Sequence, residues 1–482
     1  MPISCSTYLK NLFSHEKMSV IFIWLSFLLL SLFVAYNHEP WADEAQAWLI
    51  ARDSNVWEIL TQFARCEGQP PLWHLLLHGL ILCGLPYSAF YLVPWIISAA
   101  GVGLFLWKSP LPKWINMLIP FTYFIFFQYT IIARQYCFSL LFISWLAIIY
   151  PKRHERPFLY AFVLCLFGFS CMPGLLIAGS LYFLFLCENF RLSEKQKQNW
   201  LASGFIFIFM LAMVAVLFPD LDNPFLKVKT VMPLSEKLFA NLPVVISIPF
   251  FNSGWDFTAL FISCFFWNNK KNLLYVLILY VPLLLFFSLV VFQVWLLGYL
   301  FLVFIFSLWI FYHEPYFQNL KTNIRFWLLL YLFILHICCS YYSGLYDISF
   351  PYSSAKEVAE FIEPYHKSGK NIIATGFHSV SIQPYFSENI FTNFERGFWI
   401  YRSSAKQYRL LETLNEHGFP DVIIFFPNHV GALGAVEEPY FLEKCSESGL
   451  YELAKSFPAQ IIGKNFAEDQ SISVYIKKGK QE

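Results

Sequence analysis

The sequence carries little charge for its length. Only 13% of its 482 residues are charged, whereas 57% are hydrophobic, and a typical soluble domain has about a quarter of its residues charged. The formal net charge of +1 excludes a strongly basic protein, so no nucleic-acid partner is expected. The charged residues are distributed unevenly. Residues 19–340 are a succession of apolar runs, whereas residues 341–482 have the composition of a soluble domain.

Several motifs are also absent. The eleven cysteines contain no Cys-x-x-Cys pair and no zinc-type spacing. There is no Gly-x-Gly-x-x-Gly and no Walker sequence, which argues against the common nucleotide-binding motifs. No small-residue cleavage site follows Lys10, Lys17 and the first apolar stretch, so this stretch is interpreted as an uncleaved signal anchor.

Long apolar runs are what the sequence has instead. A helix needs about 20 apolar residues to cross the hydrocarbon core. Shorter runs predict two up-and-down pairs that enter from an outer cavity, where irregular backbone is tolerated because it lines water or protein. The long runs are Ser19–Tyr36, Ser88–Trp107, Leu201–Phe218, Asn272–Val290 and Phe292–Phe311, and the short pairs are Trp114–Ile132 with Gln135–Tyr150 and Pro157–Ser170 with Gly174–Cys187.

Basic clusters orient these runs by the positive-inside rule. Lys108 and Lys113, Lys152 to Arg156, and Lys270-Lys271 fall between runs and are assigned to the cytoplasm. The acidic loop 37–69 and the loop 219–258 are assigned to the outer side. An inner N-terminus and an outer C-terminal domain require an odd number of spans, so about eleven are predicted, with Pro70–Gly84 the weakest candidate.

The C-terminal part alternates strand-like and helical segments. Asn371–Thr375, Asp421–Phe426 and Ile472–Lys478 are typical of strands, and Ser404–His417 is typical of a helix. Ser354–Glu363 also predicts a helix, with Ser354 and Glu357 forming a capping box. We therefore expect a transmembrane domain over 1–340, with an outer loop 37–69, and an α/β domain over 341–482.

The loop after the first span contains the candidate catalytic acids. Asp43 and Glu44 are adjacent, close to the membrane surface, and about 100° apart if residues 41–52 are helical. One carboxylate would then contact a substrate, while the other caps the helix or forms an ion pair. The competing interpretation is a solvated acidic first turn that the helix dipole favours.

Other polar residues point to the same outer side. Glu67 and Gln69 precede Pro70-Pro71 where the loop re-enters the membrane, and Asp222 opens the second acidic loop. Arg134, with Tyr136, lies in an apolar region, where an arginine usually needs a partner or an anionic ligand. Its alternative role is a structural salt bridge to Asp43 or Glu67.

His74 and His78 lie four residues apart, on one face of a helix. Zinc would need further donors, and none is evident from the sequence. A packed or cavity-lining role is expected, and His74 is counted among the candidate substrate contacts. The clustered acids would permit a divalent cation, although no cofactor is predicted with certainty.

The chain resembles the superfamily C glycosyltransferases. This group includes the protein mannosyltransferases, the lipid A aminoarabinose transferases and a broad set of uncharacterised bacterial proteins, to which the similarity is closest. The segments that carry the resemblance are Trp41–Asp53 (WADEAQAWLIARD), Glu67–Leu76 (EGQPPLWHLL), Phe126–Phe142 (FFQYTIIARQYCFSLLF) and Pro351–Ile362 (PYSSAKEVAEFI).

The resemblance implies an inverting transfer of a sugar from a polyprenyl-phosphate carrier to a lipid, polysaccharide or protein acceptor. The protein would then be a multi-pass protein of the bacterial inner membrane with a periplasmic C-terminal domain. Asp43 corresponds to the catalytic base or acceptor-orienting acid, and Glu44 to an acid that supports the loop. Arg134 and Tyr136 correspond to a pair near the lipid phosphate.

Two departures leave other functions open. Gln69 stands where the family often has histidine, and Trp295–Gly298 is apolar where it often has an Arg-His pair. The chain could instead be a transporter or flippase of a lipid-linked saccharide, although transporters usually keep their acids inside the spans. A third interpretation is a non-catalytic member that binds glycolipid.

Overall fold

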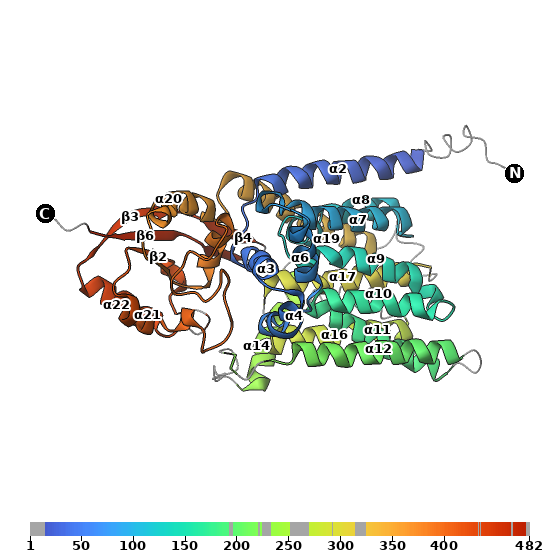
Figure 1. Cartoon of the computed structure of the whole chain (residues 1–482). Helices are drawn as coiled ribbons and strands as arrows, with labels where there is room; N and C mark the ends of the chain where they lie inside the picture. Colours follow the sequence, from blue (N-terminus) through green and yellow to red (C-terminus); the bar gives the residue numbers. More distant parts are fainter. Residues whose placement is uncertain are drawn as a thin grey trace. The chain divides into compact units, whose positions relative to one another are not determined.

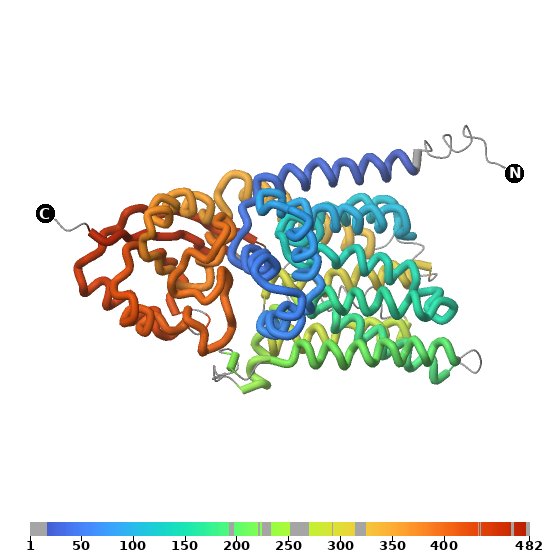
Figure 2. Tube along the Cα trace, in the orientation of Figure 1, coloured from blue at the N-terminus to red at the C-terminus, as the bar shows by residue number. Residues whose placement is uncertain are grey.

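The computed structural model is mostly helical and divides into two compact units (Figures 1 and 2). Unit 1 comprises residues 1–36, 91–211 and 232–344, and unit 2 comprises residues 37–90, 212–231 and 345–482. Loop 37–69 and residues 345–482 thus belong to one compact body. The structure describes residues 15–191, 196–219, 222–223, 233–250, 269–291, 293–313, 324–431, 433, 435–463 and 466–478.

Unit 1 is built from helices whose lengths follow the apolar runs. Its helices are α2 (His15–Asn37), α7 (Leu92–Lys108), α8 (Lys113–Leu118), α9 (Ser139–Ile149), α10 (Pro157–Ser170), α11 (Met172–Asn189), α12 (Gln196–Leu217), α14 (Leu234–Ser247), α16 (Lys270–Leu289), α17 (Gly298–Phe311) and α19 (Ile324–Ser349).

Seven helices in the described part of the chain are long and apolar enough to cross a membrane. Large apolar side chains point outward from them, with Phe22 69% exposed on α2 and Ile208 67% exposed on α12. Soluble proteins seldom expose such surface continuously, whereas lipid covers it. These features are those of a polytopic membrane protein. The seven segments are Lys17–Asn37, Tyr87–Lys108, Met172–Asn189, Lys197–Leu217, Lys270–Leu289, Val294–Phe311 and Ile324–Ser349.

The five long runs therefore form helices as predicted, and Pro157–Ser170 forms a shorter apolar helix, α10. Pro70–Gly84, the weakest candidate span, contains a short apolar helix of unit 2, α6 (Leu72–Leu82). The total of about eleven spans stays a prediction.

The segment from Lys113 to Phe138 is a broken helix rather than one continuous span. After α8, a 3₁₀ turn (Ile119–Phe121) and a π-helix (Phe124–Gln128) lead into non-helical backbone at 129–134, followed by a 3₁₀ turn at Gln135–Phe138. Every side chain from 124 to 140 is buried, so protein covers this irregular backbone.

Glycine permits close packing around the break. A Cβ on Gly298, the first residue of α17, would overlap the Phe124 ring and the Tyr129 hydroxyl. The Tyr129 hydroxyl donates a hydrogen bond to the Trp295 carbonyl at 3.0 Å. The start of α17 is thereby fixed against the broken helix.

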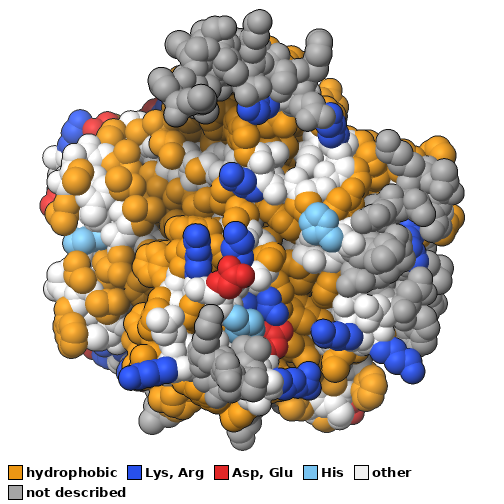
Figure 3. Space-filling view, turned by 90° about the vertical axis from the view of Figure 1, so that its right-hand side faces the viewer, with side chains coloured by type: hydrophobic (Ala, Val, Ile, Leu, Met, Phe, Trp, Pro, Cys, Tyr) orange, Lys and Arg blue, Asp and Glu red, His pale blue; other side chains and the backbone are white. Residues whose placement is uncertain are grey.

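Basic residues share one end of unit 1. Lys108 ends α7, Arg156 precedes α10, and Lys270 begins α16. These helix ends lie on the same side in Figure 1, and Figure 3 shows that face with Lys and Arg side chains spread over apolar surface.

Unit 2 contains a mixed sheet. The strand order is β1-β2-β6-β3, with β1 parallel to β2 and β6 antiparallel to both β2 and β3, and β4 pairs with β5 in a separate two-stranded sheet. The strands are β1 (Ile372–Ala374), β2 (Val422–Phe425), β3 (Tyr451–Phe457), β4 (Gln460–Gly463), β5 (Phe466–Asp469) and β6 (Ile472–Lys477).

Helices and 3₁₀ turns surround this sheet and build the loop region of unit 2. They are α3 (Ala42–Asp53), α4 (Val56–Glu58), a π-helix (Ile59–Phe63), α5 (Ala64–Glu67), α6, α20 (Ala355–Lys367), α21 (Leu410–His417), α22 (Glu438–Glu447) and the 3₁₀ segments Tyr87–Ala89, Phe377–Tyr385, Lys406–Tyr408 and Pro427–His429.

Two local predictions in this unit need correction. The helix predicted over Ser404–His417 begins only at Leu410, because a separate 3₁₀ turn occupies Lys406–Tyr408. The capping box at Ser354 is wrong. The Ser354 hydroxyl donates to the Pro458 carbonyl at 2.7 Å, and the helix end is capped from elsewhere in the unit.

That cap comes from Glu39. Its Oε1 accepts a hydrogen bond of 2.7 Å from the backbone N–H of Lys356, in the first turn of α20. A carboxylate at a helix N-terminus satisfies an orphan donor and complements the helix dipole. The residues just before α3 are thereby fastened to the C-terminal domain.

Candidate functional site: the Asp-Glu loop of unit 2

The Asp43-Glu44 pair lies in the first turn of α3. The alanine-rich segment favours a helix, and acids are stabilising at its positive end. Trp41 occupies the N-cap, and its backbone N–H donates to the Glu44 carboxylate at 3.1 Å. The Glu44 carboxylate thus caps the start of the helix.

Glu44 belongs to a buried three-residue chain. His38 Nε2 is 3.0 Å from the Glu44 carboxylate, and His38 Nδ1 is 2.9 Å from the carboxylate of Asp347. All three side chains are at most 1% exposed. Burial opposes protonation of His38, but the two carboxylates outweigh it and raise the pKa of His38 well above its usual value.

The buried Glu44 carboxylate is therefore committed to the structure of the loop. Removing one partner of such a buried set leaves an uncompensated charge. The sequence interpretation did not identify His38 and Asp347 as its partners. An aspartate near the end of the apolar run 324–349 was the signal that could have identified one of them.

Asp43 has a different environment from Glu44. Its side chain is partly exposed. Burial raises the pKa of the Glu468 carboxyl, and the negative charge of Asp43 contributes to the same shift. The two adjacent acids thus divide into a buried carboxylate and an accessible one, as the helical spacing predicted.

Glu67 is joined to α3 through Gln46. Gln46 Nε2 donates to the Glu67 carboxylate at 2.9 Å and to the Trp399 carbonyl at 2.8 Å, while its Oε1 accepts from the Trp399 N–H at 2.9 Å. Gly68 ends α5 in a left-handed conformation (φ 61°), which turns the chain into Gln69. Glu67 and Gln69 are both half-buried.

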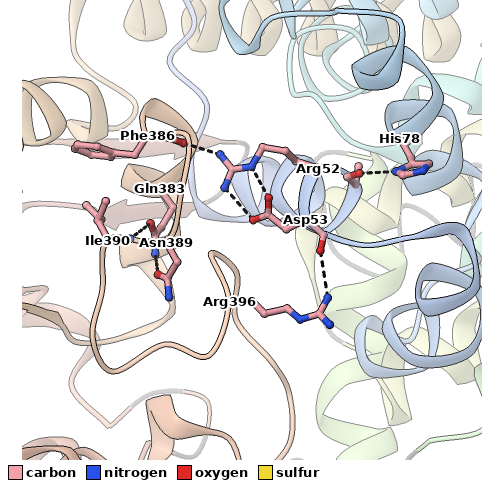
Figure 4. Close-up of polar contacts among 9 residues, drawn as sticks. Arg52, Asp53, His78, Gln383, Phe386, Asn389, Ile390 and Arg396 are labelled. Atoms are coloured by element: carbon pink, nitrogen blue, oxygen red, sulfur yellow. Dashed lines mark hydrogen bonds and ion pairs between the residues drawn. The ribbon is translucent and has the colours of Figure 1, made fainter.

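Arg52 and Arg396 anchor the other end of α3 (Figure 4). The Arg52 guanidinium pairs with Asp53 at 2.6 Å and donates to the Phe386 carbonyl at 2.7 Å. Arg396 donates to the Asp53 carbonyl at 3.2 Å and pairs with Glu58 at 2.6 Å. The sequence interpretation had counted Arg52, Asp53 and Glu58 only as charges of the loop and had not considered Arg396.

The two histidines of α6 have packing roles. His78 Nδ1 is 2.8 Å from the Ala51 carbonyl, in the last turn of α3 (Figure 4). His74 is buried, and α6 packs against α3. His78 behaves as the predicted packed residue, and substrate contact by His74 stays a prediction.

Asp222 contacts the 400–404 segment of the same unit. Its carboxylate accepts from the Ser404 hydroxyl at 2.9 Å, and its carbonyl accepts from the Ser403 N–H at 3.0 Å. The predicted substrate contact therefore also has a structural partner.

Arg134 and Tyr136 belong to unit 1 and flank the end of the broken helix. Both side chains are buried, and the Tyr136 ring lies 5.5 Å from that of Tyr129. Next to them, the Tyr299 hydroxyl contacts Ser139 at 2.6 Å and Cys171 at 2.9 Å. The predicted phosphate residues thus lie in the buried interior of unit 1.

The donor set best suited to a metal was not predicted. His378, His429 and Glu468 place ligand atoms within 4.8 Å of one another, on three separate segments of unit 2. Each histidine follows a buried strand run, which was the available signal.

Comparisons with known proteins found no family model, no curated protein and no solved structure that matches the chain. The resemblance to superfamily C glycosyltransferases stays a prediction.

Proposed function

We propose that the protein transfers a sugar from a polyprenyl-phosphate donor to a cell-envelope acceptor at the outer face of a bacterial cytoplasmic membrane. The observation that carries the proposal is the difference in burial between the Asp43 and Glu44 carboxylates. One carboxylate is buried and fixes the loop, which leaves the other accessible and held on a rigid helix end. A catalytic base needs this combination of accessibility and fixed position.

In this reaction Asp43 accepts the proton of the acceptor hydroxyl. The acceptor oxygen forms a bond to the anomeric carbon as the bond from that carbon to the phosphate oxygen breaks. The configuration is inverted, and polyprenyl phosphate leaves. For Arg134 and Tyr136, which belong to unit 1, a place near the lipid phosphate stays a prediction from the sequence, because an arginine in an apolar region suits an anionic group.

The orientation rests on the positive-inside rule. The basic end of unit 1 is assigned to the cytoplasm. Residues 37–90 and 345–482 follow α2 and α19, each of which begins at a basic end. Both segments of unit 2 are therefore assigned to the outer side.

The test is release of polyprenyl phosphate by purified full-length protein in nanodiscs. Wild type would be compared with Asp43→Asn on a panel of polyprenyl-phosphate sugars, with cell-envelope extract supplying the acceptor. Glu412→Gln is the matched control, because Glu412 is also an acid in the first turn of a helix of unit 2 and is exposed. We expect release by wild type and the control, and a loss of about 100-fold or more in Asp43→Asn.

Two results would contradict the proposal. Equal release by wild type and Asp43→Asn would remove Asp43 from the chemistry. No release from any donor by folded wild type would favour the transporter or the non-catalytic glycolipid binder.

A further inference from the structure

A pair of parallel strands brings two histidines to one edge of the unit 2 sheet. β1 and β2 are parallel neighbours, with Ile373 opposite Ile423. His378 lies four residues after the end of β1, and His429 lies four residues after the end of β2. Segments that leave the carboxyl ends of adjacent parallel strands emerge together, and ligands commonly bind there.

A third donor comes from the β4–β5 hairpin. Glu468 Oε1 lies 3.7 Å from His378 Nε2 and 3.5 Å from His429 Nε2. Two ligands on tetrahedral zinc, each about 2.0–2.1 Å from the ion, are about 3.4 Å apart. The two separations from Glu468 need to close by only a few tenths of an ångström to fit such an ion, and the ligand atoms of all three residues lie within 4.8 Å of one another.

The surroundings favour neutral imidazoles as ligands. The His378 and His429 rings stack with centroids 3.9 Å apart, which disfavours charge on both. His378 is 8% exposed, and its Nδ1 makes no hydrogen bond to any residue that the structure describes. The His429 Nε2 is also 2.9 Å from the Asp469 carbonyl, so an ion bound at this nitrogen would replace that hydrogen bond.

We propose that His378, His429 and Glu468 bind a zinc-class divalent cation near the start of α3, where the His378 ring lies 6.2 Å from that of Trp41. Two imidazoles and one carboxylate are a donor set that zinc uses in catalytic sites, where a further position stays open for water or substrate. Binding of the cation at these three residues does not depend on the proposed sugar transfer. A role for the cation in binding a phosphate oxygen next to Asp43 does rest on it.

The experiment measures metal on the intact protein without any donor. Detergent-purified full-length chain is stripped with chelator, dialysed against Zn²⁺ with excess Mg²⁺, and analysed for metal per chain. Wild type is compared with His429→Ala and Glu468→Gln, and His417→Ala is the matched control because this exposed histidine lies on α21. Cobalt substitution adds a visible spectrum that reports coordination number.

We expect one Zn²⁺ per chain in wild type and His417→Ala. Affinity should fall on the order of 100-fold in His429→Ala and in Glu468→Gln. Four-coordinate cobalt bands should appear in wild type and be lost in both site variants. All variants should elute as wild type does, since both altered side chains are only partly buried.

Equal zinc content in wild type and both site variants would overturn the proposal, and so would no zinc in wild type. Either result would leave the sugar-transfer assay unaffected, because the metal is measured without donor or acceptor. Conversely, the protein could bind zinc specifically and release no polyprenyl phosphate. That result would support the metal site and contradict the proposed sugar transfer.

Discussion

At the scale of single residues, the acids around α3 have separate tasks although they are close in sequence. Glu44 is bound to His38 and to the Trp41 N–H, and Glu39 caps α20. Asp43 has the exposure that a reacting group needs. Spacing alone predicted the division between Asp43 and Glu44. The partner Asp347 lies 309 residues from His38 and is reached only through tertiary structure.

Titration of Glu39 makes the free energy of unfolding depend on pH. Burial raises its pKa from 4.5 to about 7, despite the opposing hydrogen bond from Lys356. The folded state therefore binds a proton more tightly than the unfolded chain, and this contribution to stability is lost as the pH rises from about 4.5 to about 7. Glu39→Gln mimics the protonated form. Its unfolding midpoint should exceed that of wild type at pH 8 by about 2–4 °C and match it near pH 5.

Thermal unfolding of both proteins between pH 5 and 8 checks this expectation. Glu447→Gln serves as the control, because Glu447 is an exposed acid of a helix in the same unit, at the end of α22. A midpoint difference that is the same at every pH would rule out titration of Glu39 as its cause.

At the scale of elements, run length predicted the continuous helices well, because an apolar run of about 20 residues is long enough to cross the hydrocarbon core as one helix. It could not predict the break between Ile119 and Phe138, whose irregular backbone depends on neighbours that cover it. Strands β1 and β2 were recognisable as apolar runs, and β6 by its alternation of apolar and polar residues. Strand β3 was not, because its exposed central residues, with Glu452 and Lys455 among them, hide the pattern.

The close contact between α17 and the broken helix predicts that one added methyl group at Gly298 lowers the stability of the protein. Gly298→Ala would force Phe124 and Tyr129 to move, because the added Cβ has no room. Overpacking of this kind costs about 1–3 kcal/mol. The unfolding midpoint in detergent should fall by several degrees.

Gly204→Ala is the control, since a Cβ there meets nothing within 4 Å. Alanine in a helix interior should leave the midpoint unchanged or raise it slightly. If the two variants have equal midpoints, the close contact at Gly298 does not limit stability.

At the scale of the whole molecule, the basic end of unit 1 predicts the topology. Alkaline phosphatase fused after the C-terminus should be active, and green fluorescent protein fused there should be dark. The same reporters fused after Arg156, at the basic end, should behave in the opposite way. A fluorescent C-terminal fusion would show that unit 2 faces the cytoplasm.

The order of synthesis gives unit 2 a further property. Its segment 37–90 leaves the ribosome long before residues 345–482, which supply Asp347, Phe386, Arg396 and Trp399 as partners of the Asp-Glu loop. The loop therefore reaches its final form only after the last third of the chain has been made and delivered. A chain that stops early would carry the acidic motif without the contacts that hold it, so incomplete products would lack an ordered Asp-Glu loop.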